Sequence, residues 1–100
     1  MMNRNMIKQA QRLQAQLQKM QEELETLMVE GSAGGGVVKV VMSGKQVVES
    51  VAIAPEAAED IELLQDLVVA AVNDAFTKTQ ELAAQKMSSI TGGMKIPGLT

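Results

Sequence analysis

The chain has 100 residues, which is the length of a single domain. It has no Cys and no His, which excludes disulfides, thiolate metal sites and histidine-based acid–base catalysis. Its formal net charge is -3, and taken alone this argues against a nucleic-acid-binding protein. Phe76 is the one aromatic residue. A small, aromatic-poor core buries little area, so we expect a second copy of the chain to add burial.

The first ten residues are polar and lack the apolar run of a signal peptide. The longest apolar run, residues 67–72, is far shorter than the roughly 20 residues that span a bilayer. The absence of Cys also fits a reducing compartment. We therefore expect a cytoplasmic protein that does not cross a membrane.

Residues 3–29 have the pattern of a long helix. Apolar residues alternate at spacings of four and three, as in a heptad repeat. A helix of this length would be roughly 40 Å long, more than so small a domain can cover, so a partner-facing helix–helix contact is favoured. The alternative is packing on its own domain. We call the apolar residues that best fit this contact the apolar seam: Leu13, Leu17, Met20, Leu24 and Leu27, with Ala10 and Met6 extending it.

The Gly-rich segment 31–36 ends the helical pattern. It could cradle a phosphate, but it matches neither GxxxxGK[ST] nor GxGxxG and leads into a strand, which favours a permissive turn. Val-rich segments 37–42 and 47–53 follow, joined by residues 43–46 as a hairpin. A further strand at 27–32 overlaps the end of the helix. We place the strands within 30–54 and leave this boundary open.

Pro55 ends the last strand, and acidic residues then gather where a helix should begin. Residues 59–90 follow helical spacing, as one helix or two with a bend, within a helical segment 56–91. Ala70, Ala71 and Ala75 would allow close approach. Gly92-Gly93 would cap the helix, and residues 92–100 would form a mobile tail. The pattern predicts a long helix, two or three antiparallel strands and a second long helix, which is an α+β fold with a small antiparallel sheet.

Several segments in this order resemble the YbaB/EbfC family of nucleoid-associated proteins. The resemblance covers nearly the whole chain and depends most on Ala-Ala-x-Asn-Asp-Ala at 70–75. Further matching pieces are Gln-Ala-Gln at 9–11, Val-Glu-Gly at 29–31, Gly-Gly-Gly-Val-Val-Lys-Val at 34–40, Ile-Ala-Pro-Glu at 53–56 and Thr-Gly-Gly at 91–93. The chain lacks the Gly- and Met-rich extension that many relatives carry at the start.

The resemblance implies the element order α-β-β-β-α, with three strands between the two long helices, and a tweezer-like homodimer in which two sheets meet. It also implies binding of double-stranded DNA with a change in DNA conformation, and a role in nucleoid organisation and gene regulation.

A basic strip on the first helix is the predicted DNA-contacting surface. Residues 1–21 carry four basic residues and no acid, whereas residues 22–30 carry four Glu and no base. The strip falls outside the apolar seam and would give salt-dependent, mostly sequence-independent binding to phosphates. A merely solvated helix face is the alternative. The strip comprises Arg4, Lys8, Arg12 and Lys19, and Lys78 and Lys86 on the last helix are secondary candidates.

Other function classes fit less well. The carboxylates near 59–66 could serve an enzyme or a metal, but a helix start explains them, so we predict no catalytic residue, metal, cofactor or small-molecule substrate. A protein–protein adaptor that uses the Met/Leu/Gln seam, without DNA binding, is the main alternative. A membrane-surface role lacks aromatic anchors on the basic helix.

Overall fold

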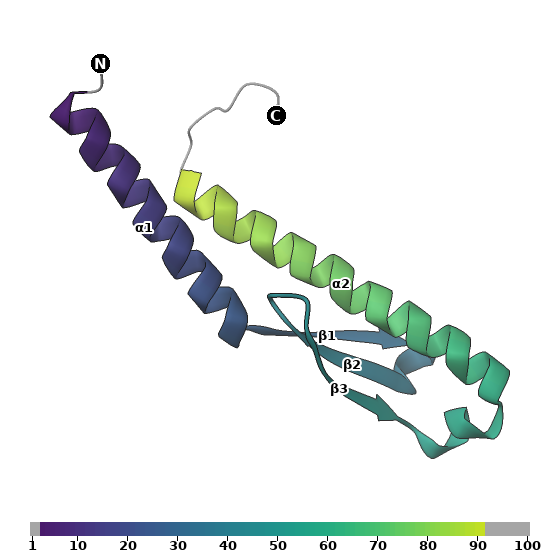
Figure 1. The fold of residues 1–100 in the computed structure, drawn as a ribbon. Coiled ribbons are helices and arrows are strands. Elements are labelled where there is room, and N and C mark those ends of the chain that lie inside the picture. The colour runs from purple at the N-terminus through teal and green to yellow at the C-terminus, as the bar shows by residue number, and fades with distance from the viewer. Residues whose placement is uncertain (1–2, 92–100) are drawn as a thin grey trace.

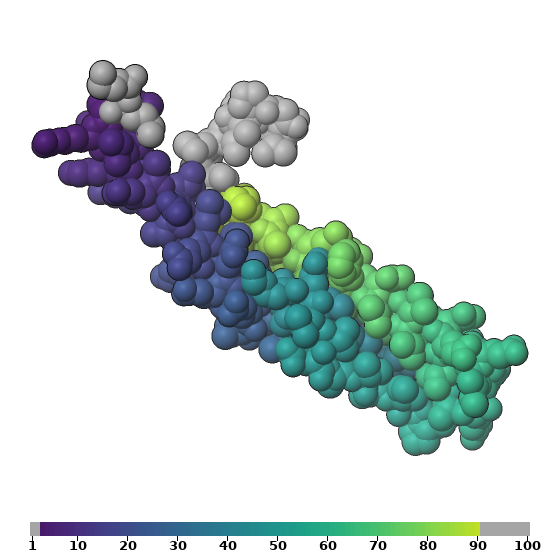
Figure 2. Space-filling model, in the orientation of Figure 1, coloured from purple at the N-terminus to yellow at the C-terminus, as the bar shows by residue number. Residues whose placement is uncertain are grey.

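The computed structural model describes residues 3–91 and has the predicted α-β-β-β-α order (Figure 1). Its elements are α1 (Arg4–Thr26), β1 (Met28–Ala33), β2 (Val38–Ser43), β3 (Val48–Ile53) and α2 (Ile61–Thr91). Short 3-10 segments at Gly34–Gly36 and Pro55–Glu59 connect β1 to β2 and β3 to α2. The space-filling view shows the start of α1 standing apart at one end of the molecule (Figure 2).

The sheet is antiparallel with strand order β1-β2-β3, and α2 packs on one face of it. Val38, Val40 and Met42 alternate along β2, so all three point to the same face. They are buried together with Ala71 and Ala75 of α2. The core is small and contains no aromatic residue, as the composition predicts.

Gly31 allows α2 to lie directly against β1. A Cβ atom at this position would collide with the Ala71 carbonyl oxygen and the Ala75 amide nitrogen. The sheet therefore approaches the helix closely at Ala71 and Ala75, as predicted, whereas Ala70 is exposed. The predicted turn over residues 31–36 is confirmed only at Gly34–Gly36, where all three glycines have positive φ, because residues 31–33 belong to β1.

The boundary between α1 and β1 differs from the predicted helix over 3–29. The helix ends at Thr26, and Leu27 is the C-cap of the helix. Residues 28 and 29 belong to strand β1. The Gly44 amide donates to the Leu27 carbonyl at 2.8 Å, and Met28 pairs with Ser43. Pairing with a strand far along the chain thus overrides the helical tendency at this point.

The second helix is a single one, beginning two residues later than the predicted start at 59. Asp60 caps it, since its carboxylate accepts from the Leu63 amide at 3.1 Å. Glu56 and Glu59 belong instead to the preceding 3-10 segment. The predicted Gly92-Gly93 cap and mobile tail lie outside the described residues.

Candidate nucleic-acid interface

Three residues of the basic strip, Arg4, Lys8 and Arg12, lie in the first half of α1, the end that projects from the domain (Figure 1), whereas Lys19 lies farther along the helix, beside the end of α2. Asn3 caps this end of the helix, because its side chain accepts from the Met6 amide at 2.8 Å. Arg4, Lys8, Arg12 and Lys19 are all exposed, and within residues 3–91 none of them has an ion-pair partner. Four cations are therefore available to an external anion.

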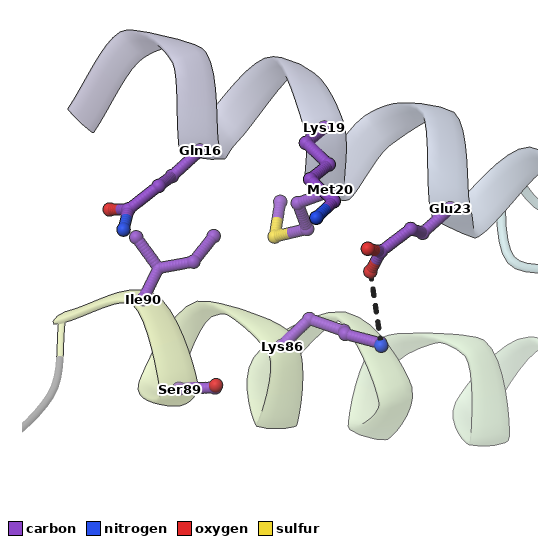
Figure 3. A pocket seen from close by; sticks show the side chains of 7 residues that line it. All are labelled: Gln16, Lys19, Met20, Glu23, Lys86, Ser89 and Ile90. Carbon is purple, nitrogen blue, oxygen red and sulfur yellow. Dashed lines mark hydrogen bonds and ion pairs between the residues drawn. The ribbon is translucent and has the colours of Figure 1, made fainter. Parts of the chain in front are cut away.

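The lower part of α1 lies beside the end of α2, and a cleft of about 210 Å³ separates them (Figure 3). Glu23 and Lys86 close one end of the cleft with an ion pair of 3.2 Å. Lys19 and Gln16 also line it. Because Arg12 lies one turn before Gln16 on the same side of α1, the basic strip continues in line with the cleft toward the free end of the helix.

The two secondary candidates on α2 already have anionic partners within the chain. The ammonium group of Lys78 lies 3.2 Å from an Asp74 carboxylate oxygen and donates to the Glu30 carbonyl at 2.8 Å. Lys86 is held by Glu23. Each has a structural contact that an approaching phosphate would have to displace or share, in contrast to the four residues of the strip.

The structure places the apolar seam partly inside the domain. Leu24 is buried, and a Cβ at Gly44 would come within 3.0 Å of its Cα, so the hairpin packs closely on it. Leu17, Met20 and Leu27 are half-buried. Leu13 is exposed, as are Met6 and Ile7 nearer the free end.

A second uncovered apolar surface lies on β3 and was not singled out in the sequence. Val51 lies directly across from Val40, and Ile53 across from Val38, so these side chains share the face that α2 covers on β2. Yet Val51 is 44% exposed while Val40 is 0% exposed, because α2 packs over β1 and β2 only. Val48, Val51 and Ile53 form what we call the β3 face. These residues do not alternate strictly, because a register shift in the pairing of β2 with β3 places Val48, rather than Glu49, across from Met42. Neither this shift nor the extent of the sheet that α2 covers can be predicted from the sequence of β3.

Comparison with known proteins places this fold among DNA-binding proteins. The model of the YbaB/EbfC DNA-binding family matches residues 1–94. The chain belongs to this family. It is 52% identical over 97 residues to a nucleoid-associated protein of Caldanaerobacter subterraneus, covering 95% of this chain and 87% of the relative. It is 55% identical over 96 residues to one of Desulforamulus reducens, covering 94% and 91%.

The fold is also that of a solved structure. An uncharacterized protein from Helicobacter pylori superposes with a TM-score of 0.79 at 19% identity, covering 92% of this chain and all of that one. The predicted family and the α+β fold are thereby confirmed. Over residues 3–91, neither helix is both long and apolar enough to cross a membrane.

Proposed function

We propose that this member of the family binds double-stranded DNA as a homodimer and changes its conformation. In this proposal it acts at the nucleoid, in the cytoplasm, and contributes to nucleoid organisation and the regulation of gene expression. The single observation that carries it is the basic strip, whose four cations are exposed and unpaired among the described residues. Relatives named as nucleoid-associated proteins support the same reading.

The homodimer is supported by the β3 face. An edge strand with open main-chain groups and apolar side chains is a ready surface for another strand or sheet. A second copy of the chain would cover Val48, Val51 and Ile53 with the same surface, as in an isologous interface. Two copies would carry two basic strips, which doubles the number of cations available to one duplex.

The contact with DNA is proposed to be with phosphates. Arg and Lys at four-residue spacing follow one side of a helix and carry no sequence information by themselves. Binding should therefore weaken steeply as the salt concentration rises. We call the slope of the logarithm of the binding constant against the logarithm of the salt concentration the salt slope, and each phosphate contact should make it steeper by about 0.9. Lys78 and Lys86 would contribute only by leaving or sharing their partners Asp74 and Glu23.

Titrating labelled duplexes at several salt concentrations tests this proposal with one matched pair of variants. Lys8→Ala and Lys45→Ala remove the same charge, but Lys45 is an exposed residue of the β2–β3 hairpin and not part of the strip. Lys8→Ala should lower the salt slope by about one unit per protomer, on random and A·T-rich duplexes alike. Lys45→Ala should leave it unchanged. Equal effects of the two variants would remove the strip from the mechanism.

A protein–protein adaptor remains the second candidate because the outer part of the seam is uncovered. Met6 is 50% exposed and Leu13 is 38% exposed, so an amphipathic partner helix could bind there. The same titration separates the two functions. An adaptor of this kind would not shift a duplex even at low salt.

A further inference from the structure

Side chains of α2 hold two main-chain groups on the outer edge of β1. In an antiparallel sheet, alternate residues of an edge strand turn their main-chain groups outward. The Leu27 carbonyl accepts from the Gly44 amide, so the odd-numbered residues that follow it in β1 turn their main-chain groups toward β2. The even-numbered residues, which include Glu30 and Ser32, turn theirs outward. The Ser32 amide donates to an Asp74 carboxylate oxygen at 3.0 Å, and the Glu30 carbonyl accepts from Lys78 at 2.8 Å.

The two side chains of α2 that contact this edge also contact each other. Asp74 and Lys78 lie one turn apart on α2 and pair with each other at 3.2 Å. The hydrogen bond from the Ser32 amide, followed by that from Lys78, lowers the pKa of Asp74 below its ordinary value. An Asp carboxylate is ionised at neutral pH, and in that state it accepts hydrogen bonds most strongly.

The outer edge of β3 has no comparable contacts. The Ala54 amide donates to the Val37 carbonyl at 2.7 Å, so the ladder alternation turns the main-chain groups of Val51 and Ile53 away from β2. Among residues 3–91, no side chain donates to or accepts from the main chain of β3. One edge of the sheet is thus occupied and the other is open.

We propose that Asp74, with Lys78, closes the outer edge of β1, so that a second copy of this chain joins only through β3. A sheet with two open edges can add copies at both and grow beyond a dimer. With β1 closed, association ends at two. Asp74 is thus a specificity-determining residue for self-association, a role that rests on the proposed homodimer.

The test compares the masses of three proteins by sedimentation across the micromolar range. Wild type should sediment as a dimer. Asp74→Ala exposes the Ser32 amide and should form species larger than the dimer, in amounts that rise with concentration. Asp74→Ala with Ser32→Pro should return to the dimer, because proline removes that amide and blocks pairing at an edge.

Amide hydrogen exchange of the folded wild type supplies a second readout that requires no variant to fold. The Ser32 amide faces outward yet should exchange slowly, because Asp74 holds it. Fast exchange of Ser32 would overturn the proposal. So would a folded Asp74→Ala protein that has the same mass as wild type at every concentration.

The same experiment tests the closure of β1 separately from the proposed homodimer. A monomeric wild type would refute the proposed dimer. In that case, association gained by Asp74→Ala and lost again with Ser32→Pro would still support closure of β1, whereas three monomeric proteins would refute both.

Discussion

Val40 and Val51 face each other across two neighbouring strands, and one is fully buried while the other is 44% exposed. Leu24 and Leu13 differ in the same way on α1, with exposed fractions of 5% and 38%. In each pair the residue types are equal and the side chains have the same local orientation. What differs is whether α2 or the hairpin extends far enough to cover them. The covered residues hold the domain together, and the uncovered ones are available to another molecule.

The largest effect should come from truncating the covered member of the α1 pair. Leu24→Ala should lower the free energy of unfolding by about 2–5 kcal/mol, because it leaves a cavity between α1 and the hairpin. Leu13→Ala should change it by less than about 0.5 kcal/mol, since that side chain is exposed. Urea denaturation of the two variants measures both. A large loss for Leu13→Ala would mean that the outer seam is buried in the assembled protein.

Gly31→Ala should have the next largest effect. The added methyl group would strike the main chain of α2, and we expect a loss of about 1–3 kcal/mol or more in the free energy of unfolding. Ser32→Ala is the matched control, because it removes an exposed hydroxyl one residue away and keeps the amide that Asp74 holds. Similar denaturation midpoints for the two variants would show that α2 can move away from β1.

The smallest effect should come from Gln46→Gly in the hairpin turn, which should raise the free energy of unfolding rather than lower it. Gln46 has a φ of 66°, a conformation that glycine adopts more easily. Gln46→Gly should therefore raise the free energy of unfolding by up to about 1 kcal/mol. Gly44→Ala should lower it, because there the glycine serves close packing, with the Leu24 carbonyl 2.6 Å from the added Cβ. A loss of stability in Gln46→Gly would contradict this division of roles.

Local sequence patterns predict two long helices with two or three strands between them, and the family resemblance implies the third strand. The three-four spacing of α1, the Val-rich strands and the long second helix each reflect a periodicity within the element itself. The end of α1 was misplaced because pairing between Met28 and Ser43 decides it, and that pairing depends on residues far along the chain.

The surfaces were harder to predict than the elements, for the same reason. Lys78 has the spacing of a solvent-facing residue, yet its partner on β1 lies 48 residues away in sequence. Asp74 belongs to the Ala-Ala-x-Asn-Asp-Ala segment, but no local pattern predicts its contact with Ser32, which lies 42 residues away in sequence. The exposure of the β3 face depends on which strands α2 covers, which no pattern within β3 encodes.

The most direct test of the central claim is sedimentation of Val51→Asp, followed by titration of a duplex. A carboxylate on the β3 face should prevent two copies from joining, since burying an unpaired charge is strongly unfavourable. We expect a folded monomer with wild-type helix content and a salt slope for DNA binding of about half the wild-type value, because one basic strip remains. A Val51→Asp protein that stays dimeric and binds DNA as tightly as wild type would contradict it.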